Sequence, residues 1–330
     1  MFGIDKLKLV MDIDDIEIIN EKAFIKKEIR DELIGLSYNQ TEPFSLEIKI
    51  DYIKLEAVIE FSGKALLSEY HNRIRLSNIK TCIDNINAIG ICRIKSYMSA
   101  KVVKCDVTND YLVSNVKRLS EFIRCNLSNY KKYIPEPLTN GNIVIHKNVT
   151  TKQCKKRLTI YDKFVEMNMA DNRRFLHDYY GGENPFLYKN NNNCRFELNL
   201  NSMAQIRSSL HISDTKLKYV LLAAQSVNPI YDFLSEILCE DVISKELTNT
   251  VEDLKRYALL HMCDFDLARV SAELDARKSK GTKLRAMLKP YREMLKSLND
   301  NSNKLSRDYV LNLVKTNTQI TAAMICQCIS

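Results

Sequence analysis

Residues 155–163 read KKRLTIYDK and contain the pattern on which the predicted fold depends. Apolar and polar residues alternate here, so Leu158 and Ile160 fall on one side of a β-strand. Thr159, Tyr161 and Lys163 fall on the other side. One strand face is therefore available to a core, and the other presents a hydroxyl beside an ammonium group. A basic run precedes the strand, so we predict that the polar face meets a polyanion and that Tyr161 is a candidate nucleophile.

Two other segments have the same design. Residues 102–108 read VVKCDVT and residues 195–200 read RFELNL, and both alternate as half-buried strands do. Asp106 and Glu197 lie on the polar sides of these segments, and Arg195 shares its side with Glu197. Such alternation is typical of a sheet with one face on a core and the other open. We therefore expect the open face to gather carboxylates, a tyrosine and several cations.

This set of groups suits phosphoryl transfer. A hard divalent cation held by carboxylates and water polarises a scissile phosphate and neutralises developing charge. Asp106 and Glu197 are the predicted metal ligands, and Glu60, at the end of an earlier strand, is a possible third. Lys163 is predicted to stabilise charge or to lower the pKa of Tyr161.

The histidines restrict the choice of metal. All five are isolated in the sequence, and no His-hydrophobe-His pair occurs. Many single-strand nickases bind their metal through such a pair. A site rich in carboxylate favours Mg²⁺ or Mn²⁺ over zinc.

Other interpretations of the same residues remain open. A polar strand face is commonly only solvent-facing, and a strand tyrosine commonly serves packing. Tyr179, Tyr180 and Tyr188 are further tyrosines in a predicted neighbouring loop. Asp162 points away from Tyr161 in a regular strand, so we expect it to pair with a cation or to cap a helix over residues 163–168.

Charge is unevenly distributed along the 330 residues, whose net charge is +8. Residues 269–296 contain nine Lys/Arg and three Asp/Glu, a local balance of +6. A second basic cluster lies near the tyrosine and is predicted to bind DNA phosphates. Its members are Lys147, Lys152, Lys155, Lys156 and Arg157. Arg195 is a further predicted DNA contact. Basic runs of this kind are also common on solvated faces.

Cysteine spacing and hydropathy restrict the class of protein. The ten cysteines contain no C-x-x-C pattern, so we interpret them as small core residues in a reducing compartment. No apolar run approaches the roughly 20 residues that span a bilayer, and the N-terminus lacks a signal-peptide pattern. We expect a soluble, cytoplasmic protein that has no membrane partner.

Periodicity changes near residue 201. Before it, predicted strands alternate with helices over 76–89 and 112–127, and after it the spacing is helical. This order predicts an α+β fold with an antiparallel-rich sheet, helices on one face and an α-helical C-terminal region. The predicted domains are residues 1–210 and 211–330.

Four segments, in this order, resemble the rolling-circle replication initiators of the filamentous-phage gene II type and related phage and plasmid replication proteins. They are residues 61–67, FSGKALL; 103–110, VKCDVTND; 157–166, RLTIYDKFVE; and 195–198, RFEL. The first is one residue shorter than the family's Ser-x-x-Lys-x-Leu segment, and lysine and cysteine precede Asp106 where the family has Arg-Ile. The resemblance covers residues 5–210.

This resemblance implies a nickase that initiates replication. Tyr161 would cut one strand at an origin through a covalent 5′-phosphotyrosine, in a reaction that depends on a divalent metal, and the displaced strand would later be rejoined. Implied partners are double- and single-stranded origin DNA and, in a bacterial host, helicase, single-strand binding protein and polymerase.

Three alternative functions remain open. A plasmid mobilisation relaxase shares the chemistry, but the lack of paired histidines counts against it. A non-catalytic origin-binding regulator would leave the sheet face inert. A structural phage protein would leave the basic clusters and the carboxylate–tyrosine face without a role.

Overall fold

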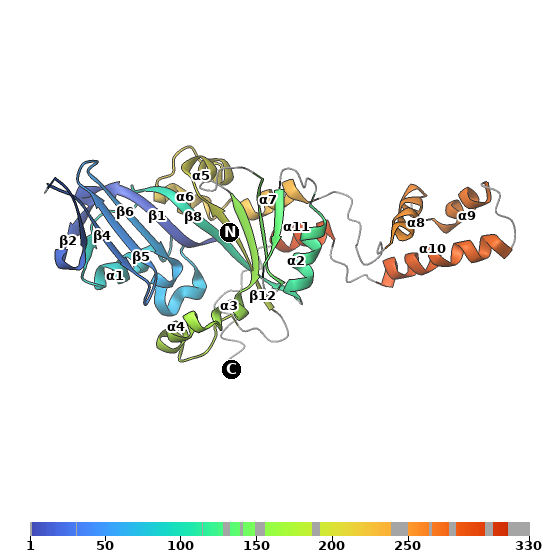
Figure 1. The fold of residues 1–330 in the computed structure, drawn as a ribbon, viewed down its shortest axis with the longest axis horizontal. Helices are drawn as coiled ribbons and strands as arrows, with labels where there is room; N and C mark the ends of the chain where they lie inside the picture. The colour runs from blue at the N-terminus through green and yellow to red at the C-terminus, as the bar shows by residue number, and fades with distance from the viewer. Residues whose placement is uncertain are drawn as a thin grey trace. The chain divides into compact units, whose positions relative to one another are not determined.

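A computed structural model of the chain shows a long, twisted antiparallel sheet with helices packed against it (Figure 1). The structure describes residues 2–30, 32–113, 115–127, 133–138, 141–148, 156–186, 192–238, 250–263, 266–276, 282–300 and 306–315. No described helix is long and apolar enough to cross a membrane.

The sheet has ten strands in the order β3-β4-β5-β6-β1-β8-β12-β11-β10-β9, and every neighbouring pair is antiparallel. Its strands are β1 (Gly3–Asp12), β3 (Ile25–Ile29), β4 (Glu32–Gln40), β5 (Leu46–Asp51), β6 (Glu56–Ser62), β8 (Lys101–Val113), β9 (Tyr133–Pro137), β10 (Ile143–Lys147), β11 (Arg157–Asp162) and β12 (Asn192–Leu200). A small second sheet pairs β2 (Ile16–Ile18) with β7 (Cys92–Ile94). The predicted α+β class with an antiparallel sheet is confirmed.

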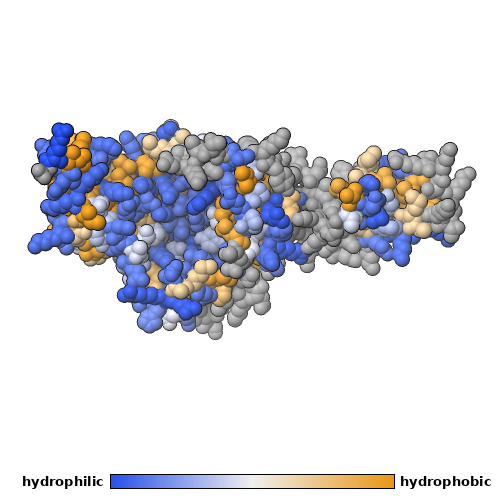
Figure 2. Space-filling model, viewed as in Figure 1, coloured by the Kyte–Doolittle hydropathy of each residue, from blue (hydrophilic) through white to orange (hydrophobic). Residues whose placement is uncertain are grey.

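The two faces of the sheet differ as the alternation predicts. Leu158, Ile160, Phe196 and Leu198 are fully buried on one face, which we call the core face. The other, open face carries the polar residues between them. In Figure 2, hydrophilic residues cover the part of the visible face over β6, β1 and β8. Neighbouring residues of one strand thus have opposite surroundings, so a shift by a single residue would bury the polar set.

A β-bulge interrupts this alternation in β1. Ile4 pairs with Val107 and Lys6 pairs with Asp106, so Asp5 is an extra residue without a partner in β8. A bulge places consecutive side chains where the regular pleat would not. Asp5 consequently joins the polar groups of the open face, where its carboxylate contacts Arg195.

The helices and 3₁₀ segments fill the connections between strands and form most of the C-terminal third. They are η1 (Ile13–Asp15), η2 (Glu21–Ala23), η3 (Gly63–Asn72), α1 (Ile79–Ala88), α2 (Val116–Cys125), α3 (Lys163–Met167), α4 (Ala170–Tyr180), α5 (Met203–Leu210), α6 (Leu217–Ala223), α7 (Pro229–Ile237), α8 (Val251–Met262), α9 (Leu267–Ala276), α10 (Thr282–Asp300) and α11 (Arg307–Lys315).

Helices pack on both faces of the sheet, which corrects the prediction of helices on one face. Lys156 shows that α5 and α7 lie on the core face, because its Nζ donates to Ser209 Oγ and lies over the Phe233 ring. Tyr70 of η3 contacts Lys163 and Arg195 on the open face. The segments η3, α3 and α4 therefore cover one end of the open face, and away from this end Arg157 is exposed and Lys104 is about one-third exposed.

The chain divides into two compact units, and the division differs from the predicted boundary at residue 210. One unit comprises the described residues within Met1–Glu121, Asn129–Ile237 and Leu313–Ser330. The other comprises those within Phe122–Ser128 and Leu238–Asn312. The helices α5, α6 and α7 pack on the sheet, so they belong to the first unit. The second has its own core around Leu260, Val270 and Leu288.

The helix α3 begins where β11 ends, and Asp162 fixes this junction. Its carboxylate Oδ1 accepts a hydrogen bond from the Val165 backbone N–H at 3.1 Å, as an N-cap does. The predicted capping role of Asp162 is confirmed. The cap determines the point at which the chain leaves the sheet and therefore the position of Lys163.

Replacing this cap is expected to destabilise the sheet unit. Asp162→Ala leaves an N-terminal amide of α3 without its acceptor and should cost about 0.5–2 kcal/mol of unfolding free energy. Asp162→Asn keeps an equivalent acceptor and should be nearly neutral. Urea denaturation of both variants and the wild type measures the difference. Equal losses for both variants would show that Asp162 acts through its charge and not as a cap.

Candidate functional site

Three central strands bring the predicted polar residues into adjacent rows across the open face. In one row Asp106 pairs with Asn199, which pairs with Arg157. In the next row Glu197 lies between Thr108 and Thr159. In the third row Asp110 pairs with Arg195, which pairs with Tyr161. Neighbouring strands lie about 4.8 Å apart, so these rows form one continuous polar surface on β8, β12 and β11.

The Tyr161 hydroxyl is directly bonded to a carboxylate. Its Oη donates to Glu197 Oε2 at 3.0 Å, and Asn199 Nδ2 donates to Glu197 Oε1 at 3.0 Å. Arg157 Nε in turn donates to Asn199 Oδ1 at 2.5 Å. Burial and the neighbouring Glu197 carboxylate raise the pKa of Tyr161 well above 10.0. The hydroxyl therefore reacts only when a base removes its proton, and Glu197 is the base in contact with it.

Three carboxylates influence one another beside this hydroxyl. Burial raises the pKa of Glu197, and the negative charges of Asp5 and Asp106 raise it further. Burial also raises the pKa of Asp106. Asp106 is only 7% exposed, and its Oδ1 is buried without a hydrogen-bond partner. Binding a proton or a cation at this part of the open face would therefore reduce the repulsion between the carboxylates.

The residues present fit a hard divalent cation. Mg²⁺ is commonly held by one or two carboxylates together with water and substrate phosphate. Asp106 supplies an unpartnered oxygen, and Glu197 lies on the adjacent strand of the same face. Among the described residues, no group of three or more histidine, cysteine or carboxylate side chains is arranged to hold a metal. Any cation here would therefore rely on solvent or substrate for most of its ligands.

Glu60 has different partners from those predicted. Its carboxylate lies 2.7 Å from Lys6 Nζ, 3.1 Å from Lys8 Nζ and 3.7 Å from Lys104 Nζ. Burial alone would raise its pKa, but the ammonium groups of Lys6 and Lys8 outweigh this effect and lower the pKa to about 2. A carboxylate neutralised by three lysines is a poor metal ligand. The prediction of Glu60 as third ligand is therefore not supported.

Lys163 lies close to Tyr161 but has other partners. It is the first residue of α3, it is 2% exposed, and its Nζ is 5.9 Å from the centre of the Tyr161 ring. The ammonium donates to Tyr70 Oη at 2.8 Å and to Glu166 Oε2 at 2.6 Å. Burial lowers its pKa, but these partners outweigh burial and raise it. Lys163 therefore acts as a fixed positive charge behind the tyrosine ring.

Arg195 is buried and not available to bind DNA, which corrects its predicted role. It is 0% exposed, and it donates to both carboxylate oxygens of Asp110, at 2.6 and 2.8 Å. It also donates to Asp5 Oδ1 at 3.2 Å and to Tyr70 Oη at 3.4 Å. Its positive charge is the cation that lowers the pKa of Tyr161 against the effect of burial. Arg195 thus performs the pKa role predicted for Lys163.

Sequence reasoning missed Asp5, Asp110 and Tyr70. Asp110 lies four residues after Asp106 in β8, and an even spacing puts both side chains on the same face of a strand. A longer predicted strand would therefore have placed Asp110 on the open face. Asp5 depends on a bulge and Tyr70 on a kinked 3₁₀ segment, and local alternation signals neither. Tyr70 packs edge-on against Phe175 and Phe186, which encloses this end of the site.

The predicted DNA-binding cluster is only partly brought together. Arg157 and Lys147 are exposed, and Arg157 lies on the open face beside Asn199. Lys156 points to the core face, where burial lowers its pKa. Lys152 and Lys155 lie outside the described residues. The structure adds a second basic group on the open face, formed by Lys6, Lys8 and Lys104, each about one-third exposed.

The other candidate tyrosines are less suited to attack. Tyr179 and Tyr180 lie in α4 and not in a loop, and both pack against Phe175. The Tyr180 hydroxyl is 3.2 Å from His71 Nδ1, and burial raises its pKa to about 12. Neither has a carboxylate hydrogen bond like that of Tyr161 among the described contacts. Tyr188 lies outside the described residues.

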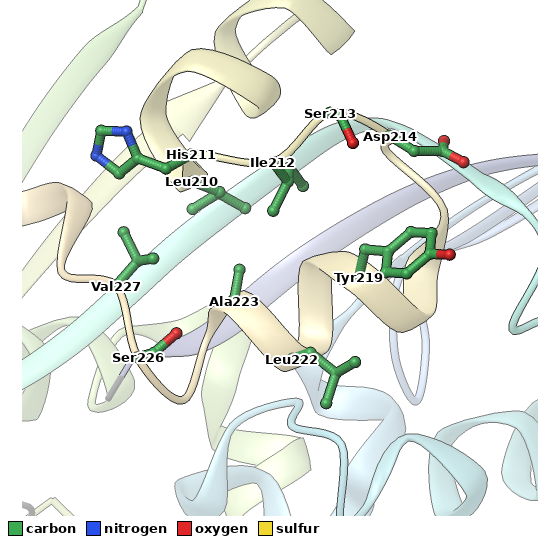
Figure 3. A pocket seen from close by; sticks show the side chains of 10 residues that line it. All are labelled: Leu210, His211, Ile212, Ser213, Asp214, Tyr219, Leu222, Ala223, Ser226 and Val227. Atoms are coloured by element: carbon green, nitrogen blue, oxygen red, sulfur yellow. The ribbon is translucent and has the colours of Figure 1, made fainter.

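A pocket of about 630 Å³ lies between the end of α5 and α6, away from Tyr161. Figure 3 shows Tyr219 and Leu222 on α6, and His211 and Asp214 on the connecting loop, among the residues that line it. None of the predicted site residues lines this pocket. The candidate site is therefore the open sheet face and not this cavity.

Comparisons with known proteins give no relative. No protein-family model matches the chain, and no significant match was found among curated proteins or solved structures.

The lowered pKa of Glu60 allows a test of its ion pairs with Lys6 and Lys8 on the open face. The folded pKa of about 2 lies below the ordinary value of 4.5, so ionised Glu60 contributes stability that is fully present above pH 4.5. This contribution is lost as pH falls towards 2. Glu60→Gln should lower the unfolding free energy at neutral pH, and its difference from wild type should shrink below pH 4.5.

Chemical denaturation across this pH range measures the difference. Glu56→Gln removes an exposed carboxyl from the same strand and is the matched control, for which we expect little change. A Glu60→Gln difference that is independent of pH would contradict the ion-paired arrangement.

Proposed function

We propose that this protein is a rolling-circle replication initiator that nicks and rejoins one DNA strand at an origin through Tyr161. The observation that carries the proposal is the 3.0 Å hydrogen bond between the Tyr161 hydroxyl and Glu197 on an open, polar sheet face. A nucleophile bonded to a base and backed by fixed charge is the arrangement that covalent catalysis requires. The order of sequence motifs resembling the gene II type supports the same reaction.

The chain's own residues perform the proposed transfer. Glu197 Oε2 accepts the proton of Tyr161 as Oη forms a bond to phosphorus. The bond from phosphorus to the 3′-oxygen breaks, and that oxygen takes a proton from water as it leaves as a 3′-hydroxyl, while Glu197 later releases its own proton to solvent. The protein then carries the 5′-phosphate on Tyr161, and the reverse sequence joins the ends. Glu197 is assigned as the base because its carboxylate is in hydrogen-bond contact with the Tyr161 hydroxyl.

Two buried cations support this step. Arg195 lowers the pKa of Tyr161, and Lys163 lies behind the ring of the tyrosinate as it forms. Both are held by carboxylates, so their charges do not have to reorganise during the reaction.

A divalent cation, Mg²⁺ or Mn²⁺, would be held by Asp106 and Glu197. It would polarise the scissile phosphate and neutralise its developing charge. The unpartnered Asp106 Oδ1 is the feature of the structure that supports this cofactor.

The substrate is single-stranded origin DNA that lies on the open face. Arg157, Lys6, Lys8 and Lys104 supply positive charge for its phosphates on the same face as Tyr161. Such contacts give affinity without base readout, so origin specificity must come from other residues. The basic helical region from Arg269 to Lys296 is proposed to contact origin duplex or a partner. Helicase, single-strand binding protein and polymerase of a bacterial host are the further proposed partners, in the cytoplasm.

A second candidate is a non-catalytic origin-binding protein. The raised pKa of Tyr161 favours it, because a half-buried tyrosine that never loses its proton serves only packing and hydrogen bonding. The two candidates differ in whether DNA becomes attached to the protein.

A nicking assay decides between them. Supercoiled plasmid carrying the protein's own origin is incubated with protein and Mg²⁺ or with chelator, and products are separated on a denaturing gel. Wild type should nick only with metal and should remain linked to the 5′ end. Tyr161→Phe should abolish both results, and Glu197→Gln should slow nicking by about 10²- to 10⁴-fold, the usual contribution of a general base.

Control variants separate chemistry from folding. Tyr179→Phe removes a hydroxyl from α4 without touching the site and should nick as wild type does. Asp106→Asn should lose metal-dependent nicking and also the rise in melting temperature that Mg²⁺ produces in wild type. Unchanged nicking by a folded Tyr161→Phe variant would disprove the proposal. Origin binding without nicking would establish the second candidate.

A further inference from the structure

The strand β3 is the edge of the ten-stranded sheet and is exposed along its whole length. Its sequence IKKEI has all five residues exposed, including Ile25 at 74% and Ile29 at 55%. Among the described residues it pairs only with β4, so its outer edge has free backbone donors and acceptors. Apolar residues are visible between charged ones at this end of the sheet (Figure 2). An exposed edge strand with apolar side chains is a template for pairing with another strand.

The sequence of β3 is complementary to itself in one antiparallel register. When two copies pair about a two-fold axis at Lys27, Ile25 of one copy lies opposite Ile29 of the other. In the same register Lys26 lies opposite Glu28, and this pair occurs twice. Opposite charges and paired β-branched residues directly across an antiparallel ladder are both favourable. We propose that β3 pairs with β3 of a second copy, so that the two sheets join into one across a two-fold dimer.

The two faces of this pairing are consistent with the alternation of the strand. Ile25, Lys27 and Ile29 point to one side, where two isoleucine pairs flank a single Lys27–Lys27 contact. Lys26 and Glu28 point to the other side, where both pairs are of opposite charge. The pairing therefore contains one repulsive contact, between the two Lys27 side chains, and four favourable ones, which are the two isoleucine pairs and the two Lys26–Glu28 pairs. Registers shifted by one residue oppose isoleucine to charged side chains and lose this match.

The local geometry leaves β3 regular enough to pair. The register shift between β3 and β4 skips Ile34, so the extra residue belongs to β4. Lys26 contacts Glu21 at 2.8 Å, and both side chains are 52% exposed. Exposed ion pairs of this kind contribute little, so Lys26 can exchange Glu21 for Glu28 of the second copy at small cost.

Charge exchange tests the register. Analytical ultracentrifugation of wild type should show a concentration-dependent dimer. Lys26→Glu and Glu28→Lys each place like charges opposite one another twice, and each should weaken dimerisation by about tenfold or more. An equimolar mixture of the two variants should recover the dimer, because every pair at positions 26 and 28 is then of opposite charge. Neither variant touches a residue of the candidate site, so nicking by each is expected to be unchanged.

Cross-linking tests the position of the axis. Lys27→Cys places a thiol opposite its own copy within disulfide reach and should give a covalent dimer on mild oxidation. Lys26→Cys lies opposite position 28 and should give little, as should wild type. A monomeric wild type at all concentrations, a polymer series, or a mixture that dimerises no better than its parents would overturn the proposal.

Discussion

The buried ion pair between Arg195 and Asp110 is the interaction on which the rest of the site depends. It joins the two central strands β8 and β12 on the open face, at 2.6 and 2.8 Å, with both residues almost fully buried. Burial raises the pKa of Asp110, but Arg195 and Arg73 outweigh burial and lower it to about 2. The same guanidinium reaches Asp5 and Tyr70. Removing either partner would leave an uncompensated buried charge, which typically costs 3–5 kcal/mol.

Around this pair the open face has two electrostatic regions. Near Tyr161, the carboxylate of Glu197 accepts a hydrogen bond from the hydroxyl, and burial raises the pKa values of Glu197 and of Asp106. Near Glu60, three ammonium groups share one carboxylate and leave a net positive charge. A cation near Glu197 would relieve the repulsion between its carboxylate and those of Asp5 and Asp106.

Alternation of polar and apolar residues predicted much of this site. Tyr161, Glu197 and Asp106 share the open face because an antiparallel ladder preserves the two-residue period from strand to strand. Lys163 also lies on this face beside Tyr161, but as the first residue of a helix and not in the strand, because the capped turn at Asp162 starts α3 there. Asp5, Tyr70 and the partners of Glu60 depend on a bulge, a kinked segment and long-range pairing, which local periodicity does not signal. The sequence predicted that α5 to α7 are helices, but it did not predict that they pack on the sheet. An amphipathic pattern shows which side of a helix is buried, and it does not show which surface that side packs against.

The central claim is that the Tyr161 hydroxyl stays protonated and donates a hydrogen bond to Glu197. Measuring the ionisation of this hydroxyl against pH tests the claim most directly. NMR of protein carrying tyrosine labelled at Cζ, with Tyr161→Phe to assign the resonance, follows its ionisation. The account predicts that Tyr161 remains protonated at pH 10.0, where an ordinary tyrosine is half ionised, and that its pKa falls in Glu197→Gln. Half ionisation of Tyr161 at pH 10.0, or the same pKa in both proteins, would contradict it.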